Sequence, residues 1–144
     1  MIAVDSNVLI YAHREDSPWH DVAYRCVQEL AEGRIPWAIP WPCVHEFLAI
    51  VTHARIYAPP TPLEGAIDQV DAWLESPTLV LLSESEGYWK EIRDVLRAAR
   101  VSGPQIHDAR VAGLCIQHGV TELWTADRDF SRFAGLTVRN PLVV

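Results

Sequence analysis

The chain has too few cysteines for a disulfide framework or a thiol-based metal site. Its 144 residues contain 3 cysteines, Cys26, Cys43 and Cys115, and no two of them form a Cys-x-x-Cys pair. Small secreted domains held by disulfides need cysteines in pairs and in larger number. We therefore expect three buried thiols in a reducing compartment, and we place the protein in the cytoplasm.

Long apolar segments and a basic surface are also missing. No apolar run approaches the roughly 20 residues that a membrane-spanning helix needs. The first residues do not combine a basic region with an apolar stretch, so no signal peptide is expected. The formal net charge of −7 argues against nonspecific nucleic-acid binding through a basic surface. A negative net charge is still compatible with an RNA or DNA substrate, because carboxylates that hold a divalent cation contribute to that negative charge.

The remaining composition is that of an ordinary globular protein. Hydrophobic residues make up 49% and charged residues 22%, which argues against disorder. This length is sufficient to build one hydrophobic core. No repeat, low-complexity tract or linker divides the sequence, so we predict a single domain over residues 1–144.

Short apolar runs alternate with segments of helical period along the chain. Strands are predicted at residues 2–4, 37–39, 78–82, 122–125 and 136–139, with the run at 78–82 expected to be buried. Helices are predicted directly after Asp5 and at residues 19–33, 43–55, 61–76, 84–100 and 105–118. This order indicates an α/β fold in which helices cover both faces of a mainly parallel sheet.

Four acidic residues lie at strand ends or in early turns of these predicted helices. Asp5 and Asp127 follow strands, Glu46 lies early in the helix at 43–55, and Asp108 lies in the first turn of the helix at 105–118. An Asp at a helix start can simply cap or stabilise that helix, but such roles do not explain why all four share this placement. The carboxyl edge of a parallel sheet is where ligands bind.

Gathered carboxylates repel one another unless a cation joins them. Hard oxygen ligands without a Cys or His pattern favour Mg²⁺ or Mn²⁺ over Zn²⁺. His45 and His107 each adjoin one of the acids. Adjacent residues on a helix point in different directions, so we do not expect either histidine to have a catalytic role.

Four motifs at these acids carry a family resemblance. They are VDSNVLIY at residues 4–11, PCVHEFL at 42–48, IHDARVAGLC at 106–115 and TADRDF at 125–130. Together they resemble the PIN-domain nucleases, particularly the VapC toxins of type II toxin–antitoxin pairs, over essentially the whole chain. The resemblance implies a PIN-like three-layer α/β/α sandwich with a mainly parallel five-stranded sheet. It also implies a Mg²⁺- or Mn²⁺-dependent endoribonuclease.

The resemblance assigns roles to particular positions. Asp5, Glu46, Asp108 and Asp127 match the acidic quartet that binds the metal and carries out catalysis in the family. Auxiliary positions follow from the same match: Ser6, Thr125 and Asp129. Thr125 matches a hydroxyl residue on the last catalytic strand, and Ser6 matches the hydroxyl that often follows the first Asp. Between Asp127 and Asp129 we prefer Asp127, because it lies closer to the end of its strand.

The family also implies what the protein assembles with and what it does to its substrate. We expect a homodimer, and a cognate antitoxin that inhibits the protein by covering the acidic cleft in a heterocomplex. The RNA substrate is expected to be hydrolysed by a metal-activated water, leaving 5′-phosphate and 3′-hydroxyl ends.

Two other function classes fit parts of the sequence. A phosphatase that forms an aspartyl phosphate would also place an Asp after the first strand, but such enzymes carry a second Asp two residues later, where this chain has Asn7. A catalytically weak PIN fold that only binds RNA or protein is the second alternative. Loss of one or more of the acids would identify that alternative, and all four are present.

Overall fold

A single parallel sheet forms the centre of the computed structural model, which describes residues 1–143. Its strands are β1 (Ile2–Val4), β2 (Trp37–Pro40), β3 (Leu79–Leu82), β4 (Glu122–Trp124) and β5 (Thr137–Arg139). They lie in the order β3-β2-β1-β4-β5, and every neighbouring pair is parallel. The predicted α/β fold with five strands is confirmed. The last residue of the predicted domain, 144, lies outside the described residues.

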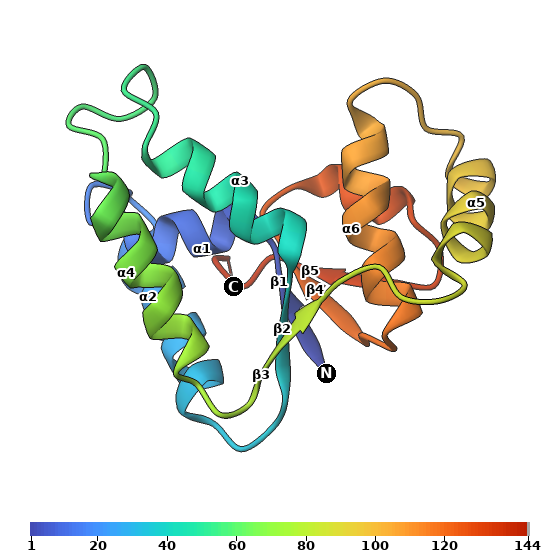
Figure 1. Cartoon of the computed structure of the whole chain (residues 1–144), viewed down its shortest axis with the longest axis horizontal. Coiled ribbons are helices and arrows are strands. Elements are labelled where there is room, and N and C mark those ends of the chain that lie inside the picture. Colours follow the sequence, from blue (N-terminus) through green and yellow to red (C-terminus); the bar gives the residue numbers. More distant parts are fainter. Residues whose placement is uncertain (144) are drawn as a thin grey trace.

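Helices cover both faces of this sheet. They are α1 (Ser6–His13), α2 (His20–Glu32), α3 (Trp41–Val51), α4 (Leu63–Leu74), α5 (Tyr88–Ala99) and α6 (Gln105–Gln117). Figure 1 shows α1 to α4 on one side of the strands and α5 and α6 on the other, which gives the predicted three layers. Within residues 1–143, no helix is both long and apolar enough to cross a membrane.

The central strand β1 shows why this arrangement forms. Ala3 and Val4 are fully buried, and Ile2 lies opposite Trp37 on one side and Glu122 on the other. A parallel strand with neighbours on both sides needs apolar residues on both faces, because helices cover each face. The uninterrupted run at the start of the chain meets that need.

The strand β3 differs from its prediction. Residues 78–82 were expected to form a buried strand, but β3 lies at the edge of the sheet and Val80 is 40% exposed. Of its four residues only Leu82 is buried. The prediction was wrong because a continuous apolar run has the same appearance in a central strand and in an edge strand.

Four helix starts, those of α2 to α5, differ from their predicted positions, and two of them have a clear local reason. The helix α3 begins at Trp41, two residues earlier than expected, since Pro42 is tolerated in a first turn where its missing N–H is not needed. The helix α5 begins at Tyr88 and not at residue 84. Gly87 precedes it with a φ of +83°, a left-handed conformation that glycine adopts readily but that no α-helix contains.

The fold gathers several element ends at one edge of the sheet. The strands β1, β2 and β4 are parallel, so their carboxyl ends lie together, away from the amino terminus (Figure 1). The helices α1 and α3 follow β1 and β2 directly, and a short 3₁₀ helix, η1 (Arg128–Arg132), follows β4. The first turn of α6 reaches the same edge from the opposite layer (Figure 1).

Candidate active site

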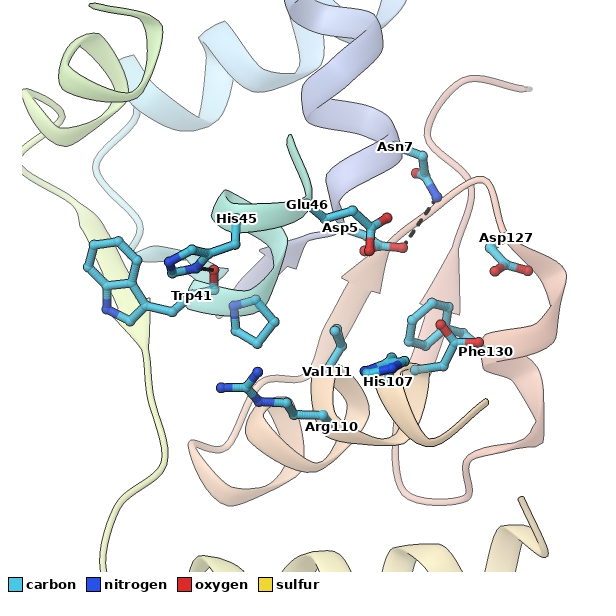
Figure 2. Close-up of a pocket in the computed structure, with 12 residues that line it drawn as sticks. Asp5, Asn7, Trp41, His45, Glu46, His107, Arg110, Val111, Asp127 and Phe130 are labelled. Atoms are coloured by element: carbon cyan, nitrogen blue, oxygen red, sulfur yellow. Dashed lines mark hydrogen bonds between the residues drawn. The ribbon is translucent and has the colours of Figure 1, made fainter. Parts of the chain in front are cut away.

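A cavity of about 390 Å³ opens at this edge between α3 and α6 (Figure 2). Asp5, Glu46, Asp108 and Asp127 all line it. Residues separated by up to 122 positions in sequence therefore face one space, as their placement at strand ends and helix starts predicted. Their catalytic and metal-binding roles stay predictions.

Asp5 is held by donors on every side of its carboxylate. Its Oδ1 accepts a hydrogen bond from the backbone N of Ser6 at 2.8 Å and from Cys43 Sγ at 3.4 Å. Its Oδ2 accepts from Thr125 Oγ1 at 2.8 Å and from Asn7 Nδ2 at 3.2 Å. Asp5 is thus the N-cap of α1 as well as a wall of the cavity, and its structural role does not exclude a functional one.

The environment of Asp5 opposes its ionisation. Its side chain is only 6% exposed, and burial raises its pKa to about 6, with the negative charge of Glu46 adding to the effect. The hydrogen bonds from Thr125, Ser6 and Cys43 lower the pKa but do not cancel the burial. An ionised Asp5 is consequently a group that a cation in the cavity would stabilise.

Asn7 joins α1 to the segment after β4, a connection that sequence reasoning missed. Its Nδ2 donates to Thr125 Oγ1 at 3.0 Å, and its Oδ1 accepts from the backbone N of Ala126 at 3.0 Å. Thr125 Oγ1 in turn accepts from the backbone N of Asp127 at 3.0 Å. The sequence offered one indication: an amide two residues after a strand-ending Asp can bond to backbone groups of a neighbouring loop.

Glu46 reaches the cavity from the middle of α3, not from its start. The helix begins at Trp41, two residues before the predicted start, so Glu46 lies about half a turn further into it than predicted. Ser6 Oγ donates to Glu46 Oε1 at 2.7 Å, which couples the auxiliary hydroxyl to one of the four acids. The side chain is exposed, as expected for a charge at the border of an apolar stripe.

Asp108 is a half-buried acid in the first turn of α6. Burial raises its pKa, and the carboxylates of Asp127, Glu46 and Asp129 raise it further, while Arg132 lowers it. Each acid therefore makes it harder for Asp108 to ionise, the electrostatic behaviour predicted for gathered carboxylates.

Asp127 and Asp129 take different places although they are two residues apart. Asp127 lines the cavity and caps η1, accepting a hydrogen bond from the backbone N of Asp129 at 2.9 Å. Asp129 is exposed and is not among the residues of the described chain that line the cavity. This geometry supports the preference for Asp127.

Both histidines next to the acids line the cavity. His45 and His107 are exposed, and Figure 2 shows the ring of His45 beside Trp41. His45 Nδ1 lies 3.0 Å from the carbonyl oxygen of Trp41. The cavity is wide enough to contact two successive residues on each of α3 and α6. That neither histidine is catalytic stays a prediction.

The donor chemistry of the cavity suits a hard divalent cation. Its candidate ligands are carboxylate oxygens. Arg110 also lines the cavity, and its Nε donates a hydrogen bond to Glu84 Oε1 at 2.6 Å. Among residues 1–143, no three His, Cys, Asp or Glu side chains already converge as metal ligands do. The four carboxylates fit a divalent cation by their oxygen chemistry and by their placement around one cavity. Because they do not yet converge, they would have to move closer to one another to bind the ion.

Comparison with known proteins identifies the class. The sequence model of the PIN domain matches residues 2–136, so this chain belongs to the PIN domain family. It is similar to two proteins of Mycobacterium tuberculosis. Ribonuclease VapC48 is 30% identical over 137 residues, covering 95% of this chain and 94% of VapC48. Ribonuclease VapC43 is 34% identical over 142 residues, covering 99% of this chain and 96% of VapC43. The resemblance to the VapC proteins is confirmed.

Solved structures agree on the fold. VapBC2 from Rickettsia felis superposes with a TM-score of 0.66 at 22% identity, covering 97% of this chain and 98% of the other. FitAcB from Neisseria gonorrhoeae superposes with a TM-score of 0.65 at 19% identity, and the match covers 100% of both chains. At these identities the likeness establishes the architecture alone.

Proposed function

We propose that this chain is a Mg²⁺- or Mn²⁺-dependent endoribonuclease and acts as the toxin of a type II toxin–antitoxin pair. The observation that carries the proposal is the placement of four carboxylates around one cavity at the carboxyl edge of the sheet. The similarity to proteins named as VapC ribonucleases supports RNA as the substrate.

Asp5, Glu46, Asp108 and Asp127 would hold the ion. When bound, Mg²⁺ or Mn²⁺ supplies Lewis-acid chemistry, lowering the pKa of water and polarising a phosphoryl oxygen. The reaction is hydrolysis: a bond forms between water oxygen and phosphorus, the bond from phosphorus to O3′ breaks, and O3′ takes up a proton. The products are 3′-hydroxyl and 5′-phosphate ends.

The chain's own residues contribute orientation and shape. The donors around Asp5 fix its carboxylate before substrate arrives, so little reorganisation remains during the reaction. Ser6 restrains Glu46 in the same way. Asp127 lies across the cavity from Glu46 (Figure 2), so a phosphodiester would bind between two acidic walls.

Cleavage of total RNA by the purified protein tests this function. Wild-type protein with Mn²⁺ should produce discrete new 5′-phosphate ends, and a chelator should abolish them. Asp127→Asn should lower cleavage by at least roughly 100-fold, since changes that only touch a metal ligand already cost 10- to 100-fold. Asp129→Asn is the matched control, because Asp129 lies two residues away but outside the cavity lining.

The same experiment separates the enzyme from a PIN fold that only binds RNA or protein. Cleavage that survives both chelation and Asp127→Asn would contradict the metal-dependent mechanism. RNA binding without any cleavage, together with no heat on calorimetric titration with Mn²⁺, would favour the binding module.

We also propose a homodimer and a cognate antitoxin that blocks the cavity. Several similar folds come from complexes named VapBC, including one from Salmonella typhimurium bound to DNA. An acidic cavity is complementary to Arg or Lys, so an inhibitor could insert a basic side chain where the ion binds.

Expression of the chain alone should stop growth, and co-expression of a small partner encoded beside it should restore growth. Harmless expression of folded protein would contradict the toxin assignment while leaving the nuclease proposal to the cleavage test.

A further inference from the structure

One wall of the acidic cavity is aromatic, and the proposed hydrolysis makes no use of it. Trp41 begins α3 directly after β2, between the fully buried Pro40 and Pro42, which also lines the cavity. The Trp41 side chain is half-buried and packs partly against the core. Its position at the strand end therefore fixes an indole ring on the wall of the cavity that holds the acids.

A second ring lies one helical turn further along α3. His45 lies with its ring centroid 6.3 Å from that of Trp41, the two planes inclined by 51°. The bond of its Nδ1 to the Trp41 carbonyl oxygen restrains the imidazole. Figure 2 shows the two rings on the same side of the cavity, with His45 between Trp41 and Glu46.

The indole also keeps its polar atom available. In the described residues, Trp37 donates its ring N–H to Ser76 Oγ and Trp124 donates its ring N–H to Glu122 Oε1. Within residues 1–143 the ring N–H of Trp41 makes no hydrogen bond to protein, so it can donate to a ligand. A half-buried Trp that lines a cavity and keeps a free donor is suited to bind a flat polar ring.

We propose that Trp41, flanked by His45, is the stacking site for an unpaired nucleobase next to the cleaved phosphate. This inference rests on the proposed ribonuclease function and adds to it a residue that binds a base of the substrate. A cavity of about 390 Å³ lies in the size range of small-ligand sites and borders both the ring and the acids. A base within a duplex is already stacked on its neighbours, so only an unpaired base can reach this ring.

The charge of the protein gives a physical reason for such a contact. With a net charge of −7 and four carboxylates at the site, the chain as a whole repels the phosphates of RNA. Stacking of a base on an aromatic ring does not depend on phosphate charge and is tolerant of sequence. It supplies affinity where electrostatics oppose binding, and we therefore expect RNA binding to depend only weakly on salt.

Fluorescence anisotropy with two labelled probes tests the assignment. One probe is oligouridine, about 12 nucleotides long; the other is a ribose-phosphate chain of equal length that carries no bases. Both are titrated in Mg²⁺ with protein that also carries Asp5→Asn to prevent cleavage. Trp41→Leu retains an apolar side chain for packing and removes the ring. Trp89→Ala is the matched control, since Trp89 is 66% exposed on α5 and outside the cavity lining.

We expect Trp41→Leu to weaken oligouridine binding about tenfold, the effect of losing one base stack, and to leave the baseless probe unchanged. Trp41→Phe should retain most of the preference for bases, and Trp89→Ala all of it. Equal loss for both probes would mean that Trp41 only supports the fold, and no loss for either would also overturn the inference. If oligouridine does not bind at all, the inference fails as well. Cleavage of total RNA by wild-type protein then decides whether the proposed function fails with it.

Discussion

Asp5 shows how a single residue can serve both the fold and the site. It caps α1 through the backbone of Ser6 and accepts a further bond from Asn7 on that helix, and its other donors come from α3 and from Thr125 after β4. A residue that only capped a helix would not need partners from three separate elements. The energy gained from these hydrogen bonds offsets part of the cost of burying a carboxylate.

Replacing Asp5 by Asn tests its role directly. The amide keeps the shape of the side chain but loses the charge that binds a cation, so cleavage and growth inhibition should fall by at least roughly 100-fold. The far-UV circular dichroism spectrum and the amount of soluble protein should match wild type. A well-expressed Asp5→Asn variant with full toxicity would refute the assignment.

The Thr125 hydroxyl should set the pH range in which Asp5 is ionised. Its hydrogen bond lowers the pKa of Asp5, so Thr125→Val should raise that pKa further. If cleavage needs the ionised carboxylate, the acidic limb of the pH–rate profile should move to higher pH. Thr125→Ser retains the hydroxyl and should restore the wild-type profile. An unshifted limb in Thr125→Val would show that Asp5 ionisation does not control the reaction.

At the scale of elements, the sequence predicted those features that depend on local pattern. Strand ends followed by acids placed Asp5 and Asp127 at one sheet edge, and apolar spacing placed Asp108 on the inner face of α6, where Val111 and Ala112 are buried. The edge position of β3 depends on strand order, which no local pattern determines.

Contacts between distant segments could not be predicted from the sequence either. Asn7 forms hydrogen bonds to Thr125 and Ala126, which lie 118 and 119 positions later in the sequence. Cys43 donates to Asp5, 38 positions earlier. Each is an ordinary residue in its own segment, and its role arises only when the fold brings the segments together. The aromatic wall at Trp41 has the same origin, since it requires α3 to begin beside β1.

Asn7 should hold the segment after β4 in place. Asn7→Ala removes the acceptor for the Ala126 amide and the donor to Thr125, so it should lower the free energy of unfolding by about 1 to 2 kcal/mol. Hydrogen exchange at Ala126 and Asp127 should accelerate more than exchange in the distant helix α5. Asn7→Asp retains the acceptor and should protect Ala126 better than Asn7→Ala does. Uniform acceleration over the whole chain would instead indicate global destabilisation.

For the molecule as a whole, the shared cavity links stability to pH and to metal. Burial and neighbouring carboxylates raise the folded pKa of Asp5 to about 6, from an ordinary value of 3.8, and raise that of Asp108 in the same direction. An acid whose pKa is raised by folding favours the unfolded state once it must ionise. The metal-free protein should therefore lose stability as pH rises through roughly 4 to 6. For Asp5 alone the loss could reach about 3 kcal/mol.

A divalent cation should reverse this loss, because it binds the ionised acids of the folded state. Mg²⁺ or Mn²⁺ at a hundred times its dissociation constant should restore about 2.7 kcal/mol by mass action. Asp108→Asn removes a repelling charge and a ligand together, so it should melt higher than wild type without metal above pH 6 and gain less from Mn²⁺. Melting curves of both proteins with and without Mn²⁺ measure this. A variant that melts lower without metal, yet gains as much as wild type from Mn²⁺, would show that Asp108 does not share a site with the other acids.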